Sequence, residues 1–281
     1  MDSSVSRGQE WAVAGARHTH VNDGNATGGG SMTHREGKAR AARIALGALV
    51  ACGAAVVRTL TAFRASEEAR RHVLPGDVIV PDPMYVTTQA VVIPAAPRAV
   101  WPWLVQMGSG RAGWYSYGRI DNGGRASAEA ILPELQHVVP GDIFPAVPGA
   151  TDAFVVAVAE PQRDLILTVP ANGATRVSWE FFLEPLDHDR TRLTVRSRLS
   201  RDWLTSARGA PAGRPIFIER VYALLARLPL PLLCAVGGFG HRVMQNQQLR
   251  GIRRRASGAV GTGPTTARRS PDTRRAPLTV P

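Results

Sequence analysis

Hydrophobic and polar residues alternate over two stretches in the second half of this chain, residues 175–183 and 191–199. In the second stretch Leu193 and Val195 fall on one face and Arg196 falls on the other. Because successive side chains of a strand point to opposite faces, this period of two predicts an antiparallel sheet with one face in the core and one face in water. Further strands are predicted at 85–93, 153–160 and 164–169.

A helical period returns near the C-terminus. An apolar stripe over 217–228 ends at two prolines, and a second helix is predicted at 241–256. Gly237 and Gly238 separate the two segments, so we expect a broken terminal helix instead of a single long one. Gln248 stands where an apolar residue would face the sheet.

The longest apolar run, IALGALVACGAAVV, covers residues 44–57. A bilayer span needs about 20 residues, a length that is reached at Phe63 if Arg58 extends toward the headgroups. We therefore predict a membrane-anchor helix at 44–63, against the alternatives of a buried helix or an exported chain with an uncleaved signal peptide. Basic residues flank both ends of the run, so no orientation is predicted.

The chain has two cysteines, Cys52 and Cys234. The sequence LVAC at 49–52 is similar to a bacterial lipobox, and a signal counted from Met32 ends just before Cys52, so lipidation is an alternative to a span. Either Met1 or Met32 fits as the true start. The apolar run continues past Cys52, which favours a small apolar residue within an anchor. Neither a disulfide framework nor a metal site is predicted.

The formal net charge of +12 is concentrated near the C-terminus. Residues 250–281 hold eight arginines against one aspartate, whereas 44–249 carry twenty arginines against seventeen acids. A basic tail is either solvated or a patch for anionic lipid, and no specific nucleic acid is expected. The predicted parts are a disordered basic tail at 1–43, the anchor at 44–63, a linker at 64–84, a globular domain at 85–256 and a disordered basic tail at 257–281.

Aromatic residues cluster at 100–117, after the first predicted strand. Residues 96–107 carry an apolar stripe that predicts a helix, and Pro102 within it predicts a kink because proline removes a backbone hydrogen bond. Glycines from Gly108 to Gly113 end the helix. Such a cluster marks either a binding site or a packing centre.

The string VWPWLVQMGSGRAGWYSY at 100–117, together with ILPELQ at 131–136 and GD at 141–142, resembles bacterial SRPBCC proteins, which are relatives of START domains and polyketide cyclases. The resemblance extends from LPGDVIVPDP at 74–83 to about Leu199 and resumes at 243–256. It implies an α+β helix-grip fold, in which a curved antiparallel sheet wraps around a C-terminal helix and two short helices follow the first strand. The apolar helix at the N-terminus is an addition to that fold.

The helix-grip fold implies a cavity between the sheet and the terminal helix. Aromatic walls with a few polar groups suit a small hydrophobic or amphipathic ligand, lipid-like or polyketide-like. The candidate cavity residues are Arg111, Trp114, Tyr115, Tyr117, Asp121, Asn122, Glu134, Trp179 and Phe181. The alternative is structural: the aromatic residues pack at a helix-to-sheet junction and Arg111 pairs with Asp121.

The sequence has no nucleophile elbow, phosphate-binding loop, dinucleotide fingerprint or metal-ligand spacing, so no catalytic residue, cofactor or metal is predicted. We predict a membrane-tethered binding domain for a small hydrophobic ligand. One alternative is a cyclase-like or hydrolytic enzyme in the same cavity, with Glu134 as base and Arg111 as electrophile. Another is an interaction module that contacts lipid or nucleic acid through the basic tail.

Overall fold

The computed structural model describes residues 34–150, 153–171, 173–204 and 217–258. Most of the two predicted tails lies outside these residues, and their disorder and lipid contacts stay predictions. The chain forms two units, one that ends at Ala51 and one that begins at Cys52. The site and its surroundings belong to the second unit.

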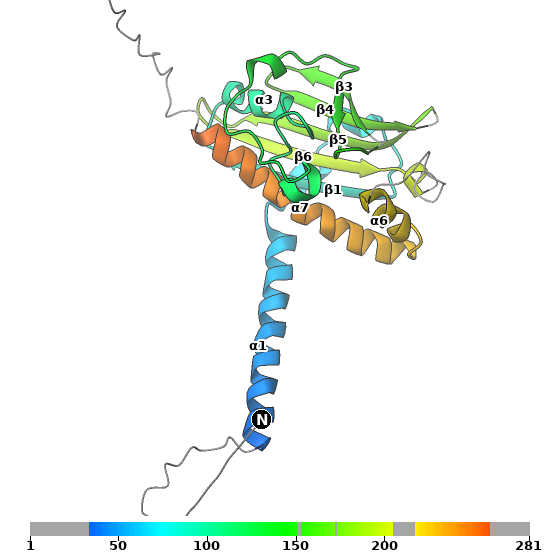
Figure 1. Ribbon diagram of the computed structural model, residues 1–281. Coiled ribbons are helices and arrows are strands. Elements are labelled where there is room, and N and C mark those ends of the chain that lie inside the picture. Colours follow the sequence, from blue (N-terminus) through cyan, green and yellow to red (C-terminus); the bar gives the residue numbers. More distant parts are fainter. Residues whose placement is uncertain (1–33, 151–152, 172, 205–216, 259–281) are drawn as a thin grey trace, which may run out of the picture. The chain divides into compact units, whose positions relative to one another are not determined.

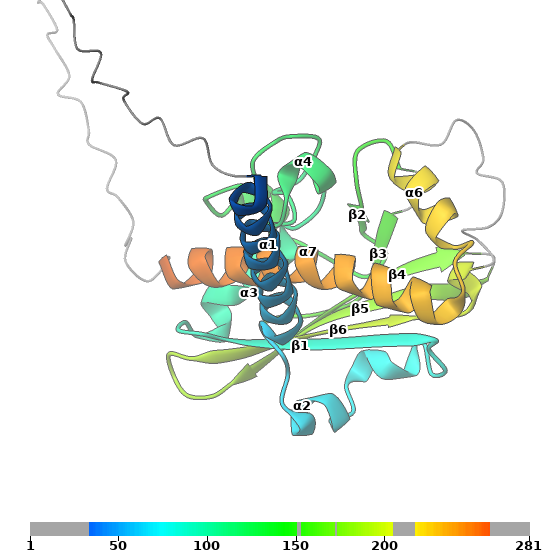
Figure 2. The same ribbon diagram turned by 90° about the horizontal axis from the view of Figure 1, so that it is seen from below.

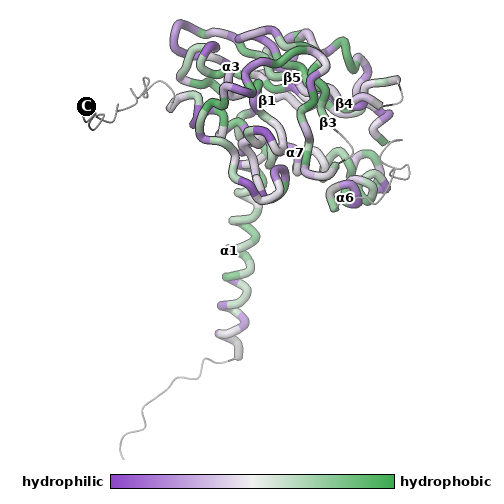
Figure 3. The backbone as a smooth tube through the Cα atoms, turned by 45° about the horizontal axis from the view of Figure 1, so that its top comes forward, coloured by the Kyte–Doolittle hydropathy of each residue, from purple (hydrophilic) through white to green (hydrophobic). Residues whose placement is uncertain are grey.

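Helix α1 covers His34–Thr61 and includes almost all of the predicted anchor. It begins before the apolar run, within the stretch predicted as a tail. Hydrophobic colour continues along most of this helix in Figure 3. From Glu36 to Thr61 the helix has the length and composition of a membrane span, which a signal sequence or a core helix can share, and its apolar window is 0% buried.

A six-stranded antiparallel sheet forms the centre of the second unit, in the order β1-β6-β5-β4-β3-β2 (Figure 1). The alternating stretches are strands, as predicted, and one short strand, β2, was not predicted. The strands are β1 Tyr85–Ile93, β2 Ile143–Pro145, β3 Ala153–Glu160, β4 Asp164–Ala171, β5 Ala174–Pro185 and β6 Thr191–Leu199.

Of the helices with described bounds, two short ones precede β1, three lie between β1 and β2, and two follow the sheet. They are α2 Glu67–Arg71, η1 Pro75–Val78, α3 Pro97–Val105, α4 Gly118–Asp121, η2 Pro133–Leu135, α6 Phe217–Leu225 and α7 Leu230–Gly258. Helix α7 crosses one face of the sheet and packs against β1 and α3 (Figure 2). We call this face the inner face. The α+β helix-grip fold class is therefore confirmed.

The predicted break in the terminal helix is wrong, because α7 is continuous through Gly237 and Gly238. Glycine costs a helix about 1 kcal/mol relative to alanine, but tertiary packing overrides that preference. Gly238 is buried, and a Cβ atom there would overlap the Tyr85 ring and hydroxyl of β1. The glycine thus allows close approach of helix and sheet. The prolines do separate α6 from α7, as predicted.

The outer face of the sheet is covered, and the prediction that its polar residues face water is wrong for Thr194 and Arg196. Helices α2 and η1, within the stretch predicted as a linker, provide the cover. The Arg196 guanidinium donates to Asp77 Oδ2 at 2.6 Å and to the Ala69 carbonyl oxygen at 2.9 Å. A buried arginine is tolerated here because its donors are paired.

Candidate functional site

Gln106, at the end of α3, organises the aromatic loop that follows it. Its side chain is fully buried, and its Nε2 donates to Tyr115 Oη at 2.9 Å. Its Oε1 accepts from the Leu132 backbone N at 3.0 Å and from Gln136 Nε2 at 3.1 Å. One amide therefore holds the loop and the segment around η2 together. The sequence analysis missed this role, although a lone glutamine between apolar helix positions was a signal for it.

Arg111 uses its donors to close its own loop. Its Nε and Nη2 donate to the carbonyl oxygens of Met107 and Val105, both at 2.9 Å, and its guanidinium lies 4.5 Å from the centre of the Phe144 ring. Burial lowers its pKa, an effect that Asp142 partly opposes. Among the described residues no ion pair joins Arg111 to Asp121 or to Glu134. These contacts are those of a residue that stabilises the loop.

Trp114 and Tyr115 are buried side by side in the core. The indole of Trp114 donates to the Ala146 carbonyl oxygen at 2.8 Å. The Arg255 guanidinium of α7 lies 4.6 Å from the centre of the Tyr115 ring, and burial raises the pKa of the Tyr115 hydroxyl. Tyr115 has φ 58°, a left-handed conformation that a bulky residue rarely adopts and that the surrounding contacts maintain.

Four aromatic rings of the inner face form a contact chain. The Trp179 ring centre lies 5.3 Å from that of Trp114, 5.1 Å from that of Phe154 and 4.9 Å from that of Phe181. These separations are typical of aromatic pairs in contact. The structure thus brings together three predicted candidates, Trp114, Trp179 and Phe181, with Tyr115 close by and Phe154 as an addition that the sequence analysis did not name.

Trp179 also contacts the first polar residues of α7. Its indole donates to Gln245 Oε1 at 3.1 Å, and the His241 ring lies 6.5 Å from its centre. His241 Nε2 is 3.4 Å from Ser197 Oγ. Burial, reinforced by the charge of Arg242, lowers the pKa of His241 to about 4, so its imidazole is neutral at pH 7. Gln248, which stands in place of an apolar residue, is paired with Gln245 at 2.6 Å.

The inner face changes from closed to partly open along its strands. Cross-strand neighbours Phe181 and Val195 are buried, at 0% and 2% exposure, as are the pair beyond them. In the opposite direction Trp179 and Ser197, and then Val177 and Leu199, are only partly buried. This end of the sheet therefore offers an apolar surface with isolated polar groups. We call the set Val177, Trp179, Ser197, Leu199 and His241 the open end.

The remaining candidates lie elsewhere. The Asn122 side chain accepts from Gly110 N and donates to Arg125 O, and Asp121 is buried, which raises its pKa. Tyr117 is 40% exposed, and Glu134 is exposed on η2. The structure therefore does not assemble Glu134, Tyr117 and Arg111 at one place.

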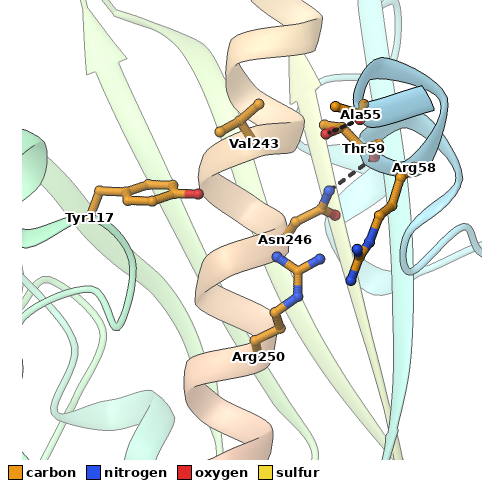
Figure 4. A pocket seen from close by; sticks show the side chains of 7 residues that line it. All are labelled: Ala55, Arg58, Thr59, Tyr117, Val243, Asn246 and Arg250. Atoms are coloured by element: carbon orange, nitrogen blue, oxygen red, sulfur yellow. Dashed lines mark hydrogen bonds between the residues drawn. The ribbon is translucent and has the colours of Figure 1, made fainter. Parts of the chain in front are cut away.

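A cavity of about 260 Å³ lies beside α7, at the C-terminal turns of α1. Asn246 joins the two helices, because its Nδ2 donates to the Thr59 carbonyl oxygen at 2.9 Å while its Oδ1 accepts from Gln89 at 2.6 Å. Figure 4 shows Arg58 and Arg250 on the same side of Asn246 and Tyr117 on the other. The lining residues are Ala55, Arg58, Thr59, Tyr117, Val243, Asn246 and Arg250.

One group of potential metal ligands lies in the exposed β5–β6 turn, at Asp187, His188 and Asp189. Arg190 already pairs with Asp187, and this hydrogen bond lowers the pKa of the Asp187 carboxyl to about 2. The contacts are those of a solvated turn, and no metal is assigned to it.

No protein-family model matches this chain, and no curated protein matches it. Solved structures do match. The polyketide cyclase-like protein Cgl2372 of Corynebacterium glutamicum is 19% identical, with 62% of this chain and 96% of that chain covered and a TM-score of 0.31. Protein MLL2253 of Mesorhizobium loti is 15% identical, with 61% and 96% covered and a TM-score of 0.32. CalU16 of Micromonospora echinospora is 15% identical, with 63% and 86% covered and a TM-score of 0.26.

The chain is similar to these proteins, but identities and TM-scores this low give no information about its ligand or its reaction. The fold is established by the topology of this chain. One strand, short helices, five further strands and a long terminal helix on the inner face follow in the order that the sequence resemblance implies. The chain therefore has a helix-grip fold.

Proposed function

We propose that this protein is a membrane-anchored helix-grip domain that binds a small hydrophobic or amphipathic ligand at the open end of its inner face. The observation that carries the proposal is the change in burial along β5 and β6. Phe181 and Val195 are sealed in the core, whereas Trp179 and Val177 on the same face stay partly exposed. Apolar side chains that the fold leaves accessible favour an apolar ligand.

The polar groups at the open end indicate which polar group the ligand carries. Neutral His241 and the Ser197 hydroxyl lie together, and the buried Thr87 hydroxyl, paired across the strands with Ser197, has no hydrogen-bond partner among the described residues. A buried hydroxyl without a partner costs stability unless a ligand supplies one. The set suits a mostly apolar molecule with one uncharged hydroxyl or carbonyl group.

Membrane anchorage is supported by α1. Apolar side chains of this helix are exposed, among them Ile44 at 63% and Leu49 at 70%. A run of exposed apolar residues of this length favours a lipid surrounding over water. Lipidation at Cys52 remains the alternative form of attachment.

The enzyme alternative has less support, because no described contact joins Glu134 to Arg111 and the Arg111 donors bind backbone carbonyls. A function of the basic tail concerns residues outside the described part of the chain.

The test compares the small molecules that co-purify with the wild-type and variant proteins. The full chain is extracted with a styrene–maleic acid copolymer, without detergent, and its organic extract is analysed by mass spectrometry. Val177→Trp fills the open end, and Val86→Trp on the outer face of β1 is the matched control. We expect an apolar molecule enriched with the wild type and with the control and lost from Val177→Trp. Equal recovery from all three chains would contradict the proposal.

A further inference from the structure

The cavity between α1 and α7 contains two arginines without acidic partners. Arg58 is exposed in the last turn of α1, and Arg250 is exposed on α7 with its guanidinium 5.5 Å from the centre of the Phe63 ring. Among the described residues no carboxylate pairs with either arginine. Two unpaired cations that line one cavity form a site for an anion.

A second cavity on α7 shows the contrast. It has a volume of about 380 Å³, and its lining includes Glu129, Arg254 and Arg255 as well as Arg250, which lines both cavities. Arg254 and Arg255 both bind Glu129 Oε1 at 2.7 Å, so their charges are largely compensated. Of these two cavities, the one with Arg58 has no carboxylate in its lining, whereas Glu129 lines the other.

Polar contacts between α1, α7 and β1 surround the first cavity. Asn246 is 2% exposed, and its side-chain amide donates to the Thr59 carbonyl oxygen and accepts from the Gln89 side chain. One turn earlier, Arg242 donates to the Leu60 carbonyl oxygen at 3.5 Å. These contacts hold the last turn of α1 against α7. The shape of the cavity is therefore set by the backbone of the two helices as well as by its arginine side chains.

If α1 spans a membrane as proposed, Arg58 lies at the level of the headgroups. It is the first charged residue after the apolar run that ends at Val57. Arginine and tyrosine are enriched at this level of a membrane, where arginine reaches phosphates and tyrosine bridges apolar and polar layers. Tyr117, which lines the cavity, matches this preference.

Apolar side chains continue from the cavity along both helices. On α1, Val57 and Leu60 are 59% and 42% exposed. On α7, Leu232 and Val236 are 47% and 46% exposed, and they share a helical stripe with Val243 of the cavity wall. An anion bound between the arginines would thus lie beside surfaces that suit acyl chains.

We propose that this cavity binds the phosphate of an anionic phospholipid headgroup, with Arg58 and Arg250 as its cationic ligands and Tyr117 as a hydroxyl donor. Guanidinium groups bind phosphate oxygens through paired, charge-assisted hydrogen bonds. The inference rests on the proposed membrane anchorage but does not depend on a ligand at the open end. The bound lipid would set the orientation of the domain on the membrane.

The experiment measures lipid retention by native mass spectrometry. The full chain in a non-ionic detergent is incubated with phosphatidylglycerol or with phosphatidylcholine of the same acyl chains. We expect selective retention of phosphatidylglycerol, reduced about five-fold by Arg58→Gln or Arg250→Gln and further in the double variant. Arg253→Gln, an exposed arginine of the same helix outside the cavity, is the matched control and should retain the lipid. Equal retention of both lipids, or equal losses in Arg250→Gln and Arg253→Gln, would overturn the proposal.

Two further arms separate the possible failures. Inorganic phosphate should displace little phosphatidylglycerol; displacement as effective as that by the lipid itself would make the cavity a free-phosphate site and overturn the lipid assignment. Flotation of cell membranes tests the anchor, and we expect the wild type and the double variant to float alike. A wild type that does not float refutes the anchorage, whereas flotation without lipid selectivity refutes only this inference.

Discussion

The two faces of the sheet are closed in different ways. On the outer face, Arg196 and Arg198 share the carboxylate of Asp77 at 2.6 and 3.2 Å. On the inner face, apolar packing around Phe181 gives way to the open end at Trp179. Polar pairing requires every partner, because a missing one leaves a buried charge. Apolar packing has no such requirement, so it can be left incomplete at one end, where we propose that the ligand binds.

The largest effect should come from breaking the polar pairing of the outer face. Arg196→Ala removes hydrogen bonds to Asp77 and to three backbone carbonyls and leaves Asp77 with Arg198 alone. We expect a loss of about 3–5 kcal/mol in the free energy of unfolding, the cost typical of a broken buried ion pair. Chemical denaturation of the full chain in detergent, followed by circular dichroism, measures it.

Arg192→Ala is the matched control for that substitution. Arg192 is on the same face of β6, but it pairs with Glu184 near the surface, where the two side chains are 40% and 47% exposed. An exposed pair contributes about 0–1 kcal/mol, so little change is expected. Similar losses for the two variants would mean that the buried network does not hold the cover on the outer face.

The strands were predictable because their alternation is local information, and they formed as predicted. The cover over Arg196 was not, since residues 64–84 have no apolar period and their attachment depends on Asp77, which lies 119 residues away along the chain. The helix break was predicted from Gly237 and Gly238. In the structure, a glycine is needed at position 238 because the helix lies against Tyr85 there. Both failures have one cause: the decisive partner is distant in sequence.

The next largest effect separates the two ends of the inner face. Leu249 of α7 is 0% exposed, and Leu249→Ala should cost about 3 kcal/mol, through lost burial and the cavity that remains. Leu199 of the open end is partly exposed, and Leu199→Ala should cost less than about 1.5 kcal/mol. The same denaturation experiment compares them. Equal losses would show that the open end is packed like the rest of the core.

The candidate site was predictable in part. The aromatic run and the strand pattern named Trp114 and Trp179, which do lie in contact. The cavity for which we propose a lipid headgroup was not predicted, because Arg58 and Arg250, which line it, are far apart in the sequence. Arg58 had been assigned to the headgroup level, but the fold alone brings a second arginine beside it.

The smallest effect concerns pH and the buried carboxyl groups of the outer face. Burial, together with the neighbouring carboxyl of Glu180, raises the pKa of Asp164 to about 8. In the unfolded chain the pKa of an aspartate is about 4. At pH values between these two pKa values, the folded protein holds a proton that the unfolded chain has released. Stability should therefore fall as pH rises from about 4 to about 8.

Asp164→Asn removes this titration and should make the protein more stable than the wild type at pH 8, by about 1–2 kcal/mol, with little gain at pH 4. Glu180 limits the gain, because its own pKa is also raised by burial while its Oε1 accepts from Gly76 N at 3.2 Å. Thermal unfolding at a series of pH values measures the difference, with Asp189→Asn in the exposed turn as the control. A wild-type stability that rises over this pH range would show that both carboxyl groups are ionised in the fold. The outer face would then tolerate buried charge, and its contrast with the inner face would rest on the arginine network alone.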